Sequence, residues 1–188
     1  MKIPAVKGIM VPLAQYATVS EDATLVEAVR TLEQAQRAFD KERYRHRAVL
    51  VLDREGRLVG KLSQHDVLRA LEPNYRSVSG LDSVSRFGLS PQYLESIARQ
   101  HGLWSTPLEG LCRSSTRLRV KEIMHAPDQG EYIEEDSPVT KALHHLVMGC
   151  HHSLLVTDKQ HEIVGVLRLT DVFSLVCQTL QDCDHGES

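Results

Sequence analysis

The 188-residue sequence lacks the features that define several classes of protein. No apolar run approaches the roughly 18 residues that span a bilayer, and the N-terminus has no apolar core of a secretory signal. Its four cysteines are scattered and form no C-x-x-C pair, so they indicate neither a disulfide framework nor a thiolate zinc site. The formal net charge of −3 argues against the basic surface that nucleic-acid binding needs. We therefore expect a soluble, cytoplasmic protein whose partners include no nucleic acid and no membrane.

Signatures of catalysis are also missing from the sequence. It contains no G-x-S-x-G elbow, no phosphate-binding P-loop and no H-E-x-x-H zinc motif. A cysteine has histidine neighbours only at 150–152, where nothing would orient a base. We expect a protein that is not an enzyme, has no catalytic residues and requires no cofactor.

What the sequence does contain is an internal duplication. The segment VKGIM at Val6–Met10 returns as VKEIM at Val120–Met124, 114 positions later; we call these the Ile-Met segments. A second pair of matching blocks, which includes Asp66 and Asp171, is 105 positions apart. The first copy therefore carries nine extra residues. Repeats of this kind are a primary signal of architecture.

Each copy predicts the element order β-α-β-β-α, an α/β (α+β) fold. Apolar residues at helical spacing follow a helix start near Ser20–Ala23, and a hairpin is expected from the strand at Ala48–Leu52. A second helix is expected to begin at Asp66. The division along the chain is repeat 1 at 1–72, an insert at 73–119, repeat 2 at 120–181 and a C-terminal tail at 182–188.

Local signals place two further helical features. The nine extra residues predict a longer first helix in repeat 1, continuing through 34–43. In the insert, Ser90 as N-cap, Pro91 as the first helical residue and Gly102 at the end predict one clear helix, and Trp104 is a candidate anchor.

A short motif recurs at the end of each hairpin. It reads Gly60-Lys61-Leu62-Ser63-Gln64-His65-Asp66 in repeat 1 and Gly165-Val166-Leu167-Arg168-Leu169-Thr170-Asp171 in repeat 2. Together with the Ile-Met segments, these motifs resemble the tandem CBS domain (cystathionine β-synthase domain) pair, or Bateman module. The resemblance implies two βαββα repeats related by pseudo-two-fold symmetry, with ligand sites in the cleft between them.

The resemblance also implies a ligand, an adenosine nucleotide such as AMP, ADP or ATP. A carboxylate at a helix start can accept hydrogen bonds from both ribose hydroxyls, and a neighbouring hydroxyl can donate to phosphate. Asp66 and Asp171 are thereby assigned to ribose and Ser63 to phosphate, with Arg47 and His152 as further phosphate candidates. The implied purine contacts are Ile9, Met10, Ala17, Thr18 and Val49 in the first site, and Ile123, Met124, Tyr132 and Leu154 in the second.

Arg168 stands where the family motif has Ser or Thr, and the sequence leaves its role open. Its guanidinium could bind phosphate in two-point fashion. It could equally fill the pocket or turn outward, which would leave one working site. Asp66 and Asp171 could also be simple helix caps.

The function that the resemblance implies is a stand-alone regulatory module. It would bind the nucleotide, report energy or metabolic state to an unidentified partner protein, and form a homodimer through its helices. One alternative is a ligand-free scaffold for dimerisation or docking. A less favoured one is a metal sensor built from the histidines and cysteine at 144–152.

Overall fold

The computed structural model describes residues 4–38, 48–78 and 90–185, in which the chain forms two compact units. Among these residues, unit 1 contains 4–17 and 127–185, and unit 2 contains 18–38, 48–78 and 90–126. Each unit therefore combines most of one repeat with the Ile-Met segment of the other. The mixed α/β fold is the one the sequence predicts.

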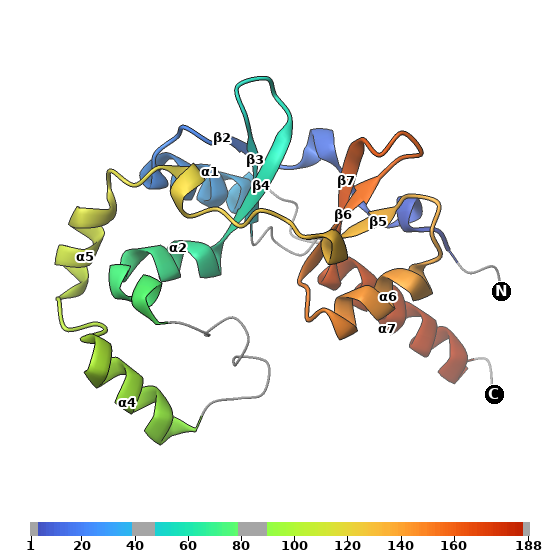
Figure 1. Ribbon diagram of the computed structural model, residues 1–188. Helices are drawn as coiled ribbons and strands as arrows, with labels where there is room; N and C mark the ends of the chain where they lie inside the picture. The colour runs from blue at the N-terminus through green and yellow to red at the C-terminus, as the bar shows by residue number, and fades with distance from the viewer. Residues whose placement is uncertain (1–3, 39–47, 79–89, 186–188) are drawn as a thin grey trace. The chain divides into compact units, whose positions relative to one another are not determined.

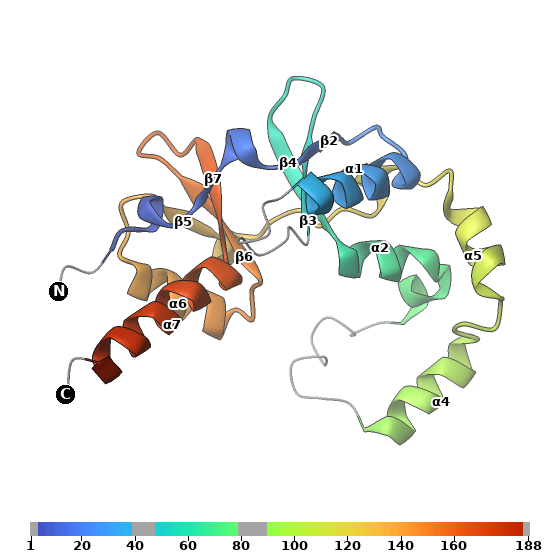
Figure 2. The same cartoon turned by 180° about the vertical axis from the view of Figure 1, so that it is seen from behind.

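Unit 1 is built on a four-stranded sheet in the order β1-β7-β6-β5. Strands β5, β6 and β7 are labelled in Figures 1 and 2. The strands are β1 (Val11–Pro12), β5 (Tyr132–Glu134), β6 (Ser153–Thr157) and β7 (Ile163–Arg168). Strand β5 runs parallel to β6, and the other two pairings are antiparallel. The helices α6 (Val139–Met148) and α7 (Leu169–His185) pack against each other and against strands β6 and β7, respectively.

Unit 2 repeats this arrangement with a three-stranded sheet in the order β2-β3-β4. The strands are β2 (Thr18–Ser20), β3 (Ala48–Leu52) and β4 (Leu58–Ser63), and the helices of the repeat are α1 (Leu25–Ala38) and α2 (Gln64–Leu71). Both hairpins carry a register shift at the same place, after Val51 and after Val156. The duplication seen in the sequence is thus repeated in backbone detail.

The helix starts differ slightly from the expected ones. Helix α1 begins at Leu25 rather than at Ser20–Ala23, because Thr24 and Glu27 exchange hydrogen bonds across its first turn. Helix α2 begins at Gln64, so Asp66 is its third residue and not its first. The extension predicted over 34–43 is seen as far as Ala38, and its remainder lies outside the described residues.

The two Ile-Met segments are exchanged between the units. Val6 of the first segment is fully buried in the core of unit 1, among side chains of the second repeat. The backbone of Val6 and Lys7 donates to Ser137 and Glu135, and Val120 and Lys121 donate to Ala23 and Glu21 in the matching way. Burial of an apolar side chain of this size contributes roughly 1.5–3 kcal/mol, so each unit depends on a segment supplied by the other repeat.

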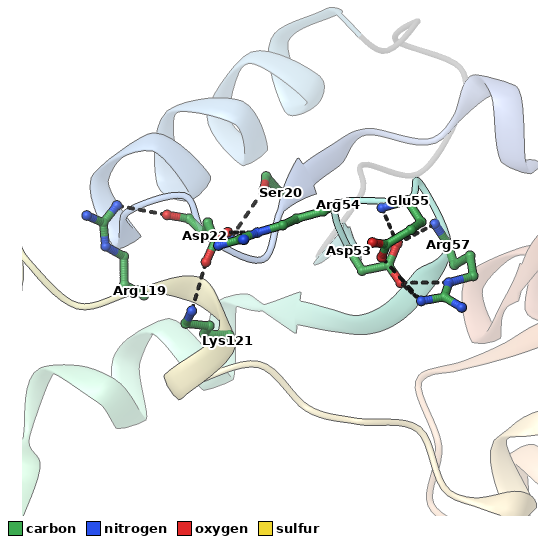
Figure 3. A network of polar contacts seen from close by, with 8 residues as sticks. All are labelled: Ser20, Asp22, Asp53, Arg54, Glu55, Arg57, Arg119 and Lys121. Carbon is green, nitrogen blue, oxygen red and sulfur yellow. Dashed lines mark hydrogen bonds and ion pairs between the residues drawn. The ribbon is translucent and has the colours of Figure 1, made fainter.

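Ion pairs reinforce this exchange. Figure 3 shows the carboxylate of Asp22 receiving hydrogen bonds from Lys121 Nζ at 2.8 Å and Arg54 Nε at 2.9 Å, while Arg119 donates to the Asp22 carbonyl. These contacts hold the pKa of Asp22 below its usual value, with the Lys121 hydrogen bond as the largest cause. In unit 1 the corresponding carboxylate, Asp136, pairs with Lys7 at 2.7 Å.

The described part of the insert belongs to unit 2. Helix α4 (Pro91–His101) has Ser90 as its N-cap and ends before Gly102, whose φ of 61° favours glycine. These bounds match the local signals, but a second helix, α5 (Leu108–Ser115), was not predicted; its N-cap Pro107 provides no side-chain hydrogen bond. Helix α5 packs against α2, as both ribbon views show (Figures 1 and 2).

The candidate anchor Trp104 is half exposed and is held by two polar contacts. Its backbone N–H donates to the buried carboxylate of Glu72 at 2.7 Å, and its indole N–H donates to the Tyr75 hydroxyl at 2.9 Å. Because Glu72 directly follows α2, the insert is fastened at the C-terminal end of that helix. None of the described helices is both long and apolar enough to cross a membrane.

Candidate functional site

The motif of unit 2 joins strand β4 to helix α2 through a capping box. Ser63 is the N-cap, and its hydroxyl oxygen accepts the backbone N–H of Asp66 at 3.2 Å. The Asp66 carboxylate accepts in return, through Oδ2, the Ser63 backbone N–H at 2.8 Å and the Ser63 hydroxyl at 2.6 Å. Both residues are half-buried.

The other oxygen of this carboxylate is available. Oδ1 of Asp66 accepts no hydrogen bond from any residue in the described ranges. An ionised carboxylate has about four acceptor positions, so Asp66 has capacity for further donors beyond the cap. The capping interpretation of Asp66 is therefore correct for Oδ2, and it leaves Oδ1 without a donor among the described residues.

The motif of unit 1 joins strand β7 to helix α7 in the same way, but its side chains interact differently. Arg168 ends strand β7 and is only 6% exposed. Its guanidinium donates to both carboxylate oxygens of Asp171, with Nε to Oδ2 at 2.7 Å and a second bond to Oδ1. The Arg168 backbone N–H also donates to Oδ2 at 3.2 Å. Both oxygens of Asp171 are consequently engaged by its own chain.

A buried tyrosine lies beside this ion pair. Tyr16 is 8% exposed, and burial raises the pKa of its hydroxyl to about 12, with Arg168 acting against that rise and Asp171 adding to it. Its hydroxyl is therefore protonated at neutral pH. Tyr16 could not be selected from the sequence, since it belongs to repeat 1 and reaches the second motif only through the exchange.

The methionines of the Ile-Met segments pack against the first glycine of each motif. A Cβ on Gly165 would lie 2.9 Å from Met10 Sδ and 2.7 Å from the Val11 carbonyl oxygen, and one on Gly60 would lie 2.7 Å from Met124 Sδ. Glycine at these positions lets the segment lie close alongside the strand with which it pairs. Met10 thus lies in the same unit as Asp171, and Met124 in the same unit as Asp66.

The remaining predicted contacts are distributed between the two units. Thr18 is exposed on β2, and Val49 is fully buried on β3 of the same unit. Ala17, Tyr132 and His152 belong to unit 1, where burial and then Glu131 raise the pKa of Tyr132. Arg47 lies outside the described residues. The structure thus brings Ser63, Asp66, Thr18, Val49 and Met124 into one unit and Asp171, Arg168, Met10, Ala17, Tyr132 and His152 into the other.

The histidine cluster does not form a metal site. No three His, Cys, Asp or Glu side chains of the described residues, which include all of 144–152, are placed to hold one ion. His151 instead lies over Gly149, where a Cβ would be 2.2 Å from its ring. The metal-sensor alternative therefore has no support in this part of the chain.

Comparison with known families decides the identity of the repeated unit. The model of the CBS domain matches twice, at residues 6–73 and 120–177. The chain belongs to the CBS domain family. The two matches cover the two sequence repeats and leave out most of the insert. A comparison with curated protein sequences finds no match.

Solved CBS structures share the fold at low sequence identity. A crystal structure of CBSX2 in complex with AMP is 16% identical, with a TM-score of 0.56 and 93% of this chain and 97% of that chain covered. The cytosolic domain of the Mg²⁺ channel MgtE in complex with ATP is 21% identical, with a TM-score of 0.54 and coverage of 93% and 49%. The CBS domain of a membrane protein from Sphaerobacter thermophilus is 20% identical, with a TM-score of 0.57 and coverage of 91% and 86%.

Proposed function

We propose that this CBS pair is a regulatory module that binds an adenosine nucleotide, AMP, ADP or ATP, through the Ser63–Asp66 motif of unit 2. The observation that carries the proposal is the Asp66 carboxylate, whose Oδ1 has no donor among the described residues while Oδ2 is fixed by the capping box. The nucleotides present in the CBSX2 and MgtE structures support this class of ligand.

The chemistry of the motif suits a ribose with a phosphate attached. Two vicinal hydroxyls can donate to one carboxylate, and Asp66 is already oriented by its bonds to Ser63. Free N–H groups in the first turn of α2 favour an anion nearby. The Ser63 hydroxyl donates to Asp66 at present, so its proposed contact with phosphate requires that proton to turn toward the ligand.

The proposed regulatory output depends on differential binding. A nucleotide shifts the conformation of a module only if it binds two states with different affinity, and coupling of this kind is typically about 1–3 kcal/mol. The regulated protein would read that shift. A regulatory role, rather than catalysis, agrees with the general character of CBS pairs.

We further propose that the module is a homodimer whose second copy packs on helices α6 and α7. These two helices of unit 1 carry exposed large apolar side chains: Leu143, Val147, Met148, Leu169, Phe173 and Leu180. Such side chains are favoured at interfaces between protein chains. The mass of the wild-type chain in sedimentation experiments tests this assignment, and a monomer at all concentrations would contradict it.

The experiment that tests nucleotide binding is a thermal-shift panel with AMP, ADP and ATP on the wild type and on Asp66→Ala. A ligand at a hundredfold excess over Kd stabilises the native state by about 2.7 kcal/mol, or roughly 5–10 °C in Tm. We expect a shift with at least one nucleotide in the wild type and its loss in the variant.

A matched control separates binding from helix capping. Asp66→Ala removes a cap worth roughly 0.5–2 kcal/mol, and Ser90→Ala removes the N-cap of α4, whose hydroxyl accepts the Tyr93 N–H at 3.2 Å. Ser90→Ala should lower the basal Tm and keep the nucleotide shift. An equal shift in Asp66→Ala and wild type would refute the ribose role of Asp66.

The second candidate function is a ligand-free scaffold for dimerisation or docking. It is favoured by the closed motif of unit 1, in which Arg168 occupies both oxygens of Asp171. A wild-type chain that gives no shift with any of the three nucleotides would favour this function, and its partner would then be another protein.

A further inference from the structure

The two CBS motifs differ at four positions, and at one of these, Ser63 or Arg168, the side chain contacts the carboxylate of the motif. Ser63 in unit 2 is a small N-cap that leaves Oδ1 of Asp66 available among the described residues. Arg168 in unit 1 is a long cation whose guanidinium donates to both oxygens of Asp171. A ribose hydroxyl needs an acceptor that the protein has not already engaged, such as Oδ1 of Asp66, and the guanidinium of Arg168 engages both oxygens of Asp171. Ligand and guanidinium therefore compete for the Asp171 carboxylate.

The ion pair in unit 1 is well protected from solvent. The exposed fractions of the Arg168 and Asp171 side chains are 7% and 14%, and the buried Tyr16 lies within electrostatic range of both. Breaking a buried pair leaves two charges without compensation, which is strongly unfavourable. A neutral sugar hydroxyl cannot replace a charge-assisted two-point contact with one of equal strength.

We propose that the side chain of Arg168 takes the place of a ribose at Asp171 and so restricts the chain to one adenosine nucleotide, bound at Asp66. This inference rests on the proposed function, because it assumes that the Asp-containing motif recognises ribose. Arg168 acts here as a residue that sets stoichiometry, and the two halves of the duplicated module have different tasks. Unit 2 binds the ligand, and unit 1 holds its own motif closed.

The test is isothermal titration calorimetry with AMP and ATP on the wild type and on Arg168→Ser. The substitution recreates in unit 1 the Ser-x-x-Asp arrangement of Ser63 and Asp66. We expect one site per chain in the wild type and two in Arg168→Ser. In the double variant Arg168→Ser/Asp66→Ala, one site should remain, since only the opened motif of unit 1 can bind.

Two further variants show whether an added site is due to the loss of Arg168 itself. Arg113→Ser removes an exposed arginine from α5 and should leave one site, and Arg168→Thr is a second hydroxyl variant should Arg168→Ser fold poorly by circular dichroism. Two sites in the wild type, or no added site in the folded Arg168 variant, would overturn the inference. A third outcome separates the two proposals: the wild type binds no nucleotide, while Arg168→Ser binds one. That result would refute the proposed function of Asp66, and it would still support the inference that Arg168 blocks the motif of unit 1.

Discussion

At the scale of single residues, the motif glycines and the methionines of the Ile-Met segments are both accounted for by the close contact between them. The first glycine of each motif faces the methionine of an Ile-Met segment that comes from the other repeat. The contact is so close that a side chain at the glycine would displace sulfur or backbone. The recurrence of both residue types in the sequence therefore reflects packing between the repeats.

The first prediction concerns how much a side chain added at each of these two glycines lowers the free energy of unfolding. In Gly165→Ala the new Cβ would lie 2.7 Å from the Val11 carbonyl oxygen, whereas in Gly60→Ala it would lie 2.7 Å from the flexible Met124 Sδ and 3.0 Å from a carbonyl. Overpacking typically costs about 1–3 kcal/mol. We expect Gly165→Ala to lower the free energy of unfolding more than Gly60→Ala, as measured by urea denaturation.

Gly8→Ala is the control for this pair, because a Cβ at Gly8 would meet nothing within 4 Å. Its stability should remain close to that of the wild type. Equal stability of the Gly165→Ala and Gly8→Ala chains would show that β1 does not lie against β7 at Gly165 as described.

At the scale of elements, local sequence signals predicted the bounds of α4 and of strand β3 well, whereas α1 begins later and α2 earlier than expected. Ser90, Pro91 and Gly102 define α4 through their own backbone preferences. Helix α5 was missed because Pro107 offers no capping side chain and the helix gains its stability from packing on α2. The anchor of the insert was only partly foreseen, since Glu72 carries no local sign that it will meet Trp104.

The second prediction tests that anchor. Glu72→Ala removes the carboxylate that accepts the backbone N–H groups of Trp104 and Asn74, and the loss of one such hydrogen bond costs about 0.5–1.5 kcal/mol. Because Trp104 is the only tryptophan, its fluorescence reports this site alone. We expect red-shifted emission and weaker attachment of the insert.

Glu109→Ala, an exposed substitution on α5, should leave the emission unchanged. If Glu72→Ala also leaves it unchanged, the contact between Glu72 and Trp104 is not maintained in solution.

At the scale of the whole molecule, the duplicated chain forms units that are not continuous in sequence. The duplication could be recognised from VKGIM and VKEIM. Because these two segments are nearly identical, nothing in their sequence indicates that each one packs with the other repeat. The placement of Tyr16 beside Arg168 follows from the same exchange. The state of Arg168 was also undetermined by sequence, because a guanidinium can point outward or inward. In the structure its direction is set by the half-buried Asp171.

The third prediction uses the paired carboxylates that hold the exchanged segments. The pKa values of Asp22 and Asp136 are lowered, chiefly by hydrogen bonds from Lys121 and Lys7. Their stabilising effect is therefore complete above the unfolded value of 3.8 and is lost as the pH falls through the lower folded value. We expect the free energy of unfolding to decrease in acid below about pH 4, in urea titrations over a series of pH values.

The double variant Asp22→Asn/Asp136→Asn tests the assignment. It should be less stable at neutral pH and should lose less stability in acid than the wild type does. An acid dependence equal to that of the wild type would mean that other carboxylates are responsible.

The proposal that Asp66 binds the nucleotide is tested most directly by a crystal structure of the chain grown with AMP. We expect the ribose hydroxyls within hydrogen-bond distance of the Asp66 carboxylate, while Arg168 remains paired with Asp171. Ribose bound at Asp171 with Arg168 displaced, or AMP bound without any contact to Asp66, would contradict it.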